Sequence, residues 1–445
     1  MNERHITVLG GGLAGCEAAF AIAEQGVPVI LREMKPLHYT PAHHAPQLCE
    51  LVCSNSLKAK RIDSAAGLLK EEMRRMGSLC VPVADGCAVP AGGALAVDRD
   101  RFAEEVTRRI EEHPLITIEH EVVETLPDDG ITVVATGPLT QEPLAEDIRR
   151  VCGGALSFYD AAAPIVEADS VDPALSFTAS RYDREESGQG DYINCPMNKD
   201  EYEAFHAALI SAERAKLHAF DTPGDRQVYE GCMPIEILAG RGLDAIRFGP
   251  MKPVGLRDPR TGHRPWAVLQ LRRENAEGTL LNLVGFQTNL TFPEQNRVFG
   301  MIPALHDAHF VRYGVMHRNT FIDAPRLLGP DYALKQRPHL FFAGQITGVE
   351  GYMESAMAGM LAGHNALRRL RGEAPLVLPR TTMMGALTAY ISDESVMHFQ
   401  PMGANFGILP SLPDKIRDKR QRYAALAVRA LRDLERYQPG KDENI

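Results

Sequence analysis

Long apolar runs are absent from this 445-residue chain, although 44% of its residues are hydrophobic. A helix that crosses a membrane needs roughly 20 consecutive apolar residues, so we expect no membrane segment and no membrane partner. The chain also enters an apolar strand almost at once, without the charged and apolar regions of a cleavable signal. We therefore expect a cytoplasmic protein with a large core, in two domains or in one domain with a sizeable insertion.

Paired cysteine spacings are absent as well. No Cys-x-x-Cys pair and no fixed Cys/His ladder occurs, so we expect neither a metal site nor a disulfide framework. In a reducing compartment, such cysteines are either small core side chains or reactive thiols. The eight cysteines are Cys16, Cys49, Cys53, Cys80, Cys87, Cys152, Cys195 and Cys232.

An excess of positive charge is also lacking, since the formal net charge is -10. Nucleic-acid phosphates require Lys and Arg, so this charge weighs against a nucleic-acid partner unless the cations are concentrated locally. Two segments concentrate them, although a solvated helix face explains each segment equally well. One contains Lys58, Lys60 and Arg61, and the other contains Lys415, Arg417, Lys419, Arg420 and Arg422.

The first 33 residues carry the pattern of a βαβ unit. Residues 5–9 form an apolar strand, 10–15 read Gly-Gly-Gly-Leu-Ala-Gly, and 16–23 predict an alanine-rich helix. A second strand at 27–31 ends near the acidic Glu33. A Gly-x-Gly-x-x-Gly segment between a strand and a helix, with an acidic residue after the next strand, is the dinucleotide-binding fingerprint.

Each glycine of this fingerprint has a physical task. Gly10 permits the tight turn, Gly12 lets the backbone approach a pyrophosphate, and Gly15 lets the helix pack closely on the sheet. The helix N-terminus then faces the phosphates with its partial positive charge, while Glu33 accepts hydrogen bonds from the adenosine ribose. The cofactor-binding residues predicted here are Gly10, Gly11, Gly12, Leu13, Ala14, Gly15 and Glu33.

The following segments continue the same fold. A helix is predicted at 65–76, and Asp98 is expected to cap a helix that runs to about residue 112. Strands are predicted at 115–119 and 131–135. The second ends in Ala-Thr-Gly at Gly137, a pattern that recurs where the backbone of two-dinucleotide flavoproteins passes close to the cofactor.

The chain returns to the cofactor near its C-terminus. A strand at 338–345 ends in Ala-Gly and leads through a glycine-rich segment into a helix at 353–370 that is lined with small residues. Such a helix places backbone amides near a flavin, and close packing in a core explains the small residues equally well. The cofactor-binding residues predicted in the later segments are Gly137, Gly344, Gln345, Gly351 and Tyr352.

We therefore predict an α/β protein, with an FAD-binding, Rossmann-like domain of the two-dinucleotide-binding type that carries an inserted substrate domain. The predicted divisions are 1–140 for the first part of the FAD-binding domain, 141–324 for the insertion, and 325–445 for the second part with a C-terminal tail. The insertion is expected to be mixed α/β because Pro and Gly interrupt its pattern often.

Several long motifs narrow the reaction. They are Leu-Val-Cys-Ser-Asn-Ser-Leu at 51–57, Pro-Ala-Gly-Gly-Ala-Leu-Ala-Val-Asp at 90–98, Asn-Cys-Pro-Met at 194–197, Tyr-Glu-Gly-Cys-Met-Pro-Ile-Glu at 229–236, Phe-Gly-Pro-Met-Lys-Pro-Val-Gly at 248–255 and Tyr-Gly-Val-Met-His-Arg-Asn-Thr at 313–320. These motifs closely resemble those of the TrmFO family, and the resemblance runs from residue 5 to about 410. Members of that family are methylenetetrahydrofolate-, FAD- and tRNA-dependent uracil-5-methyltransferases.

The resemblance implies methylation of uridine-54 in the T-loop of tRNA. The carbon would come from 5,10-methylenetetrahydrofolate, and the electrons from FAD reduced by NADPH or NADH. By motif, Cys232 would be the nucleophile on uracil C6, and Cys53 the base for the C5 proton near the flavin. The resemblance implies no stable protein partner.

The same reaction also explains why two thiols and a flavin suffice. Uracil C5 becomes nucleophilic only after a group adds to C6, and thiolate is the strongest nucleophile among side chains at neutral pH. A base must then remove the C5 proton, and a reduced flavin provides the hydride. A free cysteine is more often a buried filler, as expected for Cys16, Cys80, Cys87 and Cys152. A structural role is expected for Cys195.

Three alternatives remain at this point. Flavoproteins that modify wobble uridine have a much longer chain with an additional helical domain. A plain NAD(P)H-dependent flavin oxidoreductase would show a second Gly-x-Gly-x-x-Gly, which is absent. A flavin-binding scaffold without activity would not need the two cysteine motifs.

Overall fold

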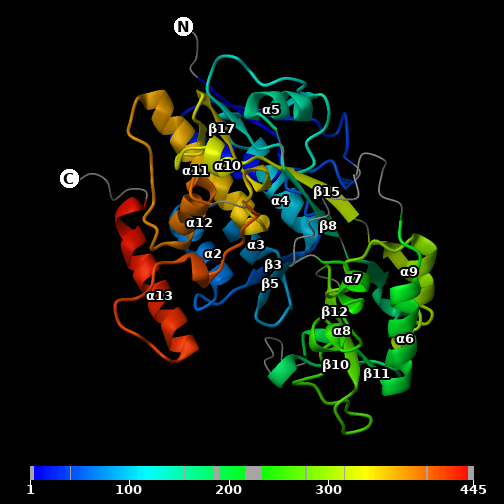
Figure 1. Cartoon of the computed structure of the whole chain (residues 1–445). Helices are drawn as coiled ribbons and strands as arrows, with labels where there is room; N and C mark the ends of the chain where they lie inside the picture. The colour runs from blue at the N-terminus through cyan, green and yellow to red at the C-terminus, as the bar shows by residue number, and fades with distance from the viewer. Residues whose placement is uncertain are drawn as a thin grey trace.

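The computed structural model describes residues 5–40, 42–154, 156–161, 163–183, 190–215, 233–275, 278–314, 316–396 and 399–438, with the backbone alone at 156–161, 183 and 316–320. These residues form a large lobe, which holds the first and last described residues, and a smaller lobe from the middle of the chain (Figure 1). No described helix is both long and apolar enough to cross a membrane.

The large lobe is built around a six-stranded sheet with the order β16-β17-β7-β1-β2-β6. The strands from β17 to β6 are parallel, and β16 is antiparallel to β17. The central strands β1 and β7 are covered on both faces, which explains their almost entirely apolar sequences. The strands predicted in the first 135 residues are thereby confirmed. The bounds are Ile6–Leu9 (β1), Val29–Glu33 (β2), Ile116–His120 (β6), Thr132–Val134 (β7), Ala333–Leu334 (β16) and Arg337–Phe342 (β17).

Two helices from opposite ends of the chain pack against each other beside this sheet. They are α1, Leu13–Ala23, and α11, Tyr352–Arg371. A Cβ atom added at Gly359 would lie 2.0 Å from the Ala14 carbonyl oxygen, and one at Gly363 would lie 2.7 Å from that of Ala18. The small residues of α11 are therefore explained by close helix packing, one of the two interpretations of the sequence.

Helix α1 begins earlier than predicted, because Leu13, Ala14 and Gly15 already belong to its first turn. The predicted cap at Asp98 is confirmed, since its side chain accepts a hydrogen bond from the Arg101 N–H at 3.2 Å. The other elements of the large lobe are α2 Ala65–Arg75, α3 Cys80–Gly86, α4 Arg99–Glu111, α5 Leu144–Cys152, α10 Ala324–Leu327, α12 Met383–Ser392, α13 Lys419–Leu434, and a small sheet of β3 Ser56–Ala59, β5 Ala94–Val97 and β4 Ala88–Val89.

The smaller lobe is mixed α/β, as the sequence predicts for the insertion. Its sheet has the order β10-β11-β12-β13-β9-β14 and is antiparallel throughout. A separate hydrophobic cluster fills it, with Tyr202, Phe205, Phe286 and Phe299 fully buried. The bounds are β9 Ile165–Glu167, β10 Phe177–Thr178, β11 Tyr192–Met197, α6 Lys199–Ser211, α7 Ile235–Ala239, α8 Ala245–Phe248, β12 Ala267–Arg273, β13 Leu280–Leu283, α9 Phe292–Phe299 and β14 Phe310–Arg312.

A two-stranded ribbon lies between these two bodies of structure. It pairs β8, Leu156–Ala161, with β15, Met316–Phe321, in antiparallel register. Helix α5 belongs to the hydrophobic cluster of the large lobe, in which Leu144 and Ile148 are buried. The domain divisions at 140 and 324 remain predictions.

Candidate functional site

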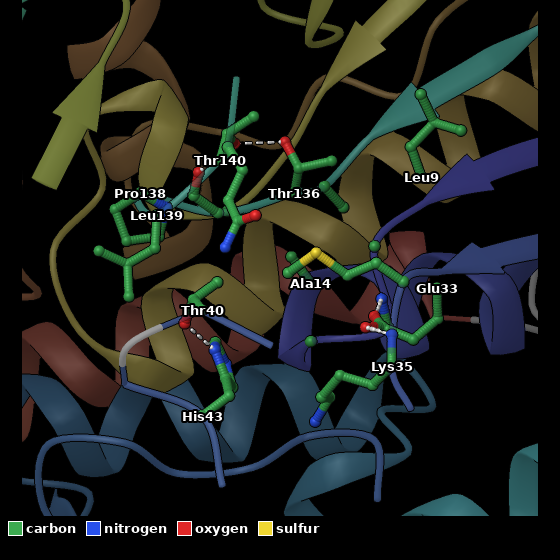
Figure 2. A pocket seen from close by; sticks show the side chains of 18 of the residues that line it. Leu9, Ala14, Glu33, Lys35, Thr40, His43, Thr136, Pro138, Leu139 and Thr140 are labelled. Atoms are coloured by element: carbon green, nitrogen blue, oxygen red, sulfur yellow. Dashed lines mark hydrogen bonds between the residues drawn. The ribbon is translucent and has the colours of Figure 1, made fainter. Parts of the chain in front are cut away.

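A pocket opens at the carboxyl ends of β1, β2, β7 and β17, the edge at which parallel sheets bind ligands. It has a volume of about 1290 Å³, part of which is open to solvent, and Figure 2 shows its lining. Segments from the beginning, the middle and the end of the large lobe therefore meet at one cavity. The predicted residues that line it are Gly10, Gly11, Gly12, Leu13, Ala14, Glu33, Gly137, Gly344, Gln345 and Tyr352.

The fingerprint glycines occupy three different environments. Gly10 has a φ of +96°, and an added Cβ would lie 2.7 Å from the Ala135 carbonyl oxygen. An added Cβ at Gly15 would lie 1.7 Å from the Gly10 carbonyl oxygen, so helix and strand touch there. Gly12 is exposed, and no protein atom lies within 4 Å of an added Cβ. The open space in front of Gly12 is what a closely bound phosphate requires.

Helix α1 presents its N-terminus to the pocket. Gly12 is the N-cap and provides no side-chain cap, while Leu13 and Ala14 line the cavity. The first N–H groups of a helix carry a partial positive charge and form a natural site for phosphate. The start of α1 therefore has the geometry that the predicted dinucleotide site requires.

Glu33 has a structural task that the sequence did not reveal. Its buried carboxylate accepts hydrogen bonds from the Gly11 N–H at 2.5 Å and from the Lys35 N–H at 2.9 Å. It therefore holds the glycine loop in place while lining the pocket. Lys35 is buried as well, and its Nζ atom donates to the Ala45 carbonyl oxygen at 3.2 Å.

Two predicted residues lie outside the pocket lining. Gly15 is buried between α1 and the sheet. Gly351 caps α11, where an added Cβ would lie 2.6 Å from the Lys58 Nζ atom and would clash with the carboxylate of Glu354. Gly351 thus makes room for an ion pair, in which Lys58 Nζ lies 2.7 Å from Glu354 Oε1.

The polar residues of the pocket that the sequence analysis did not select include two hydrogen-bonded pairs (Figure 2). The hydroxyl groups of Thr136 and Thr140 hydrogen-bond at 2.6 Å, and Thr40 Oγ1 lies 2.5 Å from His43 Nδ1. Burial, followed by the charge of Lys35, lowers the pKa of His43. Thr136 and Thr140 could have been selected from the sequence, because they follow the end of a predicted strand. Nothing in the sequence singles out Thr40 or His43.

Cys53 lies at the edge of this pocket. It is half-buried and follows Val52, which lines the cavity. Its backbone N–H donates to the Tyr352 hydroxyl oxygen at 2.7 Å, and the N–H of Ser54 donates to the same oxygen at 3.1 Å. Burial raises the pKa of Tyr352, so its hydroxyl group stays protonated. The structure thus brings two predicted site residues, Cys53 and Tyr352, together.

Three arginines from both lobes hold the Cys53 segment. Arg99 Nη1 donates to the Leu51 carbonyl oxygen at 2.7 Å, and Arg272 Nη2 donates to Ser54 Oγ at 3.0 Å. Arg312 donates to the carbonyl oxygen of Val52. Arg272 is buried, and Arg99 forms an ion pair with the buried Glu274. The segment therefore lies in a cationic environment that sequence reasoning missed, since Arg272 and Arg312 belong to the smaller lobe.

The second predicted thiol, Cys232, lies outside the described residues. Among the other cysteines, Cys16, Cys80, Cys87 and Cys152 are buried, as the filler interpretation predicts. Cys195 is buried in β11, where burial raises its pKa to about 12.

Comparison with known proteins resolves the family. The methyltransferase of Geobacter sulfurreducens named "Methylenetetrahydrofolate--tRNA-(uracil-5-)-methyltransferase TrmFO" is 56% identical over 433 residues, which cover 97% of this chain and 98% of that protein. The equally named protein of Enterococcus faecalis is 53% identical over 429 residues, which cover 96% and 97% of the two chains. The chain belongs to the TrmFO family. The resemblance inferred from the motifs is thereby confirmed.

Two further matches agree with this family and with the fold. Residues 5–374 match the family model described as "Glucose inhibited division protein A". The solved structure of Aquifex aeolicus GidA superposes with a TM-score of 0.70 at 18% identity, covering 97% of this chain and 74% of that one. At this identity the likeness concerns the fold alone, and it confirms the predicted fold class.

Proposed function

We propose that this protein methylates C5 of uridine-54 in the T-loop of tRNA, with 5,10-methylenetetrahydrofolate as the carbon donor. The names of relatives that are more than half identical over nearly the whole chain support the substrates. The observation that carries the proposal is the hydrogen bond from the Cys53 backbone N–H to Tyr352, because it holds the backbone of a cysteine against a residue that lines the dinucleotide pocket. A cytoplasmic location stays a prediction.

The residues of the pocket fit FAD. The space in front of Gly12 and the uncapped start of α1 fit its pyrophosphate, and Glu33 lies at the end of β2, where an adenosine ribose is bound in this fold. Gly344 and Gln345 line the cavity from the segment after β17, and Tyr352 lines it from the start of α11. When bound and reduced by NADPH or NADH, FAD supplies the hydride that converts a C5 methylene into a methyl group.

The side chains of this protein then have separate tasks. Cys232 would add to uracil C6, and C5 of the resulting enolate would form a bond to the methylene carbon of the folate. Cys53 would then remove the C5 proton as tetrahydrofolate leaves, and the bond between C6 and Cys232 would break once a hydride has reached the new carbon. Tyr352 fixes the backbone of Cys53 through two hydrogen bonds. Arg99, Arg272 and Arg312 contact the Cys53 segment, and they would place positive charge beside a uracil that becomes anionic during the addition.

The proposal is tested by incubating the protein with a T-arm minihelix, NADPH and methylenetetrahydrofolate labelled in its methylene carbon. Label recovered in 5-methyluridine supports the proposal. Oxidation of NADPH without label in the RNA would instead indicate a flavin oxidoreductase. Label that arrives only from S-adenosylmethionine would refute the carbon source.

A further inference from the structure

Two basic segments from opposite ends of the chain meet on the surface of the large lobe. Arg61 Nη2 lies 2.6 Å from Asp63 Oδ2, and Arg420 Nε lies 3.5 Å from the same oxygen. This junction lies where α13 packs beside α2 (Figure 1). We name the combined region the basic surface. It consists of Lys58, Lys60, Arg61, Lys415, Arg417, Lys419, Arg420 and Arg422.

The basic surface reverses the charge of the protein locally. Residues 58–64 and 414–422 contain eight Lys or Arg residues and three Asp residues, whereas the whole chain has a net charge of -10. Arg420 and Arg61 are 79% and 52% exposed, respectively. Among the described carboxylates, none forms an ion pair with Lys415, Arg417, Lys419 or Arg422. Positive potential is thus available to a polyanion.

The charges in the first turn of α13 are unfavourable for the stability of the helix. Its first turn holds Lys419, Arg420 and Arg422 and no acidic residue, although cations near a helix N-terminus oppose the helix dipole. The Asp418 side chain offsets this in part by accepting a hydrogen bond from the Gln421 N–H at 2.8 Å. A bound anion would relieve the remaining repulsion.

Two cations of α13 also contact an aromatic ring that is itself packed in place. The Lys419 ammonium and the Arg422 guanidinium lie 5.5 Å and 5.6 Å from the centre of the Tyr423 ring. Tyr423 in turn stacks on Phe406 at 4.3 Å. Because these contacts hold the cations in place, a ligand would lose less entropy in ordering them.

The basic surface begins close to the candidate site. Lys58 comes five positions after Cys53, so at most about 18 Å of extended chain joins them. Lys58 also pairs at 2.7 Å with Glu354, which lies on the same helix as Tyr352. A polyanion bound here would therefore be the part of the substrate next to the reacting base.

We infer that the basic surface binds the sugar–phosphate backbone of the tRNA arm that carries the target uridine. The inference rests on the proposed function for the identity of the RNA. Phosphate binding by Lys and Arg releases counterions, so its affinity falls with salt in proportion to the number of contacts. That dependence distinguishes a phosphate-binding surface from a solvated helix face.

The test compares two double variants that each remove two exposed cations. Lys419→Gln with Arg420→Gln changes the basic surface, whereas Arg432→Gln with Arg436→Gln changes the other end of the same C-terminal region, where Arg432 is 71% exposed. Binding of a T-arm minihelix is measured by fluorescence anisotropy at several salt concentrations, without folate. The first variant should bind about tenfold more weakly, with a salt slope smaller by about 2, and the control should match the wild type.

A third variant is expected to strengthen RNA binding. Asp63→Asn removes the carboxylate shared by Arg61 and Arg420, so RNA should bind several-fold more tightly and with a steeper salt slope. Equal melting temperatures would show that all variants are folded. The inference is refuted if the Lys419/Arg420 variant keeps wild-type affinity and slope, or if the control loses as much.

These experiments distinguish a failure of the RNA-binding inference from a failure of the methylation proposal. The wild type could incorporate label from methylenetetrahydrofolate while the variants bind RNA equally well. In that case the basic surface does not bind the RNA, and the methylation proposal is supported. If the salt slopes change as expected but no label enters the RNA, the methylation proposal is wrong, and binding of RNA by the basic surface is supported. When both hold, the Lys419/Arg420 variant should raise the KM for the minihelix and leave kcat unchanged.

Discussion

The hydroxyl oxygen of Tyr352 accepts the backbone N–H of Cys53 at 2.7 Å, although 299 residues separate the two in sequence. Tyr352 belongs to the helix that closes the pocket, and Cys53 belongs to the loop after the first βαβ unit. The position of the thiol is therefore coupled to the wall of the dinucleotide pocket. This coupling is the basis of the first prediction.

Tyr352→Phe should impair methylation without unfolding the protein. The change removes the acceptor of the N–H groups of Cys53 and Ser54, and an unsatisfied buried N–H costs about 1–3 kcal/mol. The loop should shift, and kcat should fall about tenfold to hundredfold at an unchanged KM for RNA. Single-turnover methylation measures this effect. Tyr390→Phe removes a hydroxyl that donates to the Gln400 carbonyl oxygen, and this control should keep wild-type kcat.

Gly12→Val should give a folded apoprotein. An added Cβ at Gly12 meets no protein atom within 4 Å, so the side chain would occupy the space assigned to the pyrophosphate. Flavin absorbance of the purified protein measures occupancy, and thermal melting measures folding. Gly86→Val, which also meets no atom within 4 Å, should retain FAD. Full occupancy in Gly12→Val would place the cofactor elsewhere.

Glu72 should give the stability of the protein a defined pH dependence. Burial raises its pKa to about 8, while its carboxylate accepts the N–H groups of Met383 and Met384, both at 2.8 Å. An unfolded Glu has a pKa of about 4.3. Between these pKa values the folded protein keeps a proton that the unfolded chain has lost, so the free energy of unfolding should fall as pH rises from about 4.3 to about 8.

Denaturant unfolding of the wild type and of Glu72→Gln at pH 5 and pH 8 measures this contribution. The glutamine variant cannot ionise, so its free energy of unfolding should fall less over the same interval. Equal pH dependence of the two proteins would contradict the assigned burial effect.

The two predicted thiols should respond differently to RNA with 5-fluorouridine at the target position. If Cys232 attacks C6, such RNA becomes covalently bound, because fluorine cannot leave as a proton does. Cys232→Ala should then lose trapping and methylation, whereas Cys53→Ala should lose methylation and keep trapping. Denaturing electrophoresis detects the adduct. Cys152→Ala, which alters a thiol whose pKa burial raises to about 12, should behave as the wild type.

The reverse pattern, with trapping lost in Cys53→Ala and kept in Cys232→Ala, would exchange the two roles. Trapping in both single variants would show that neither thiol alone is the nucleophile.

The sequence predicted those parts of the site that depend on local geometry. The roles of Gly10, Gly12 and Gly15 depend on residues that are close to them in sequence. The βαβ unit and its pocket could therefore be predicted. The cations that hold the Cys53 segment could not, because Arg272 and Arg312 reach it from another lobe. Likewise, both basic segments were visible in the sequence, but their junction at Asp63 depends on tertiary packing.

Mass spectrometry of nucleosides can show whether this protein builds a methyl group on tRNA from a folate carbon and a reductive hydride. The reaction is carried out with methylenetetrahydrofolate that carries two deuterium atoms on the transferred carbon. We expect 5-methyluridine with both deuterium atoms and one hydrogen in the new methyl group. A methyl group without deuterium, or one that acquires label only from deuterated S-adenosylmethionine, would contradict it.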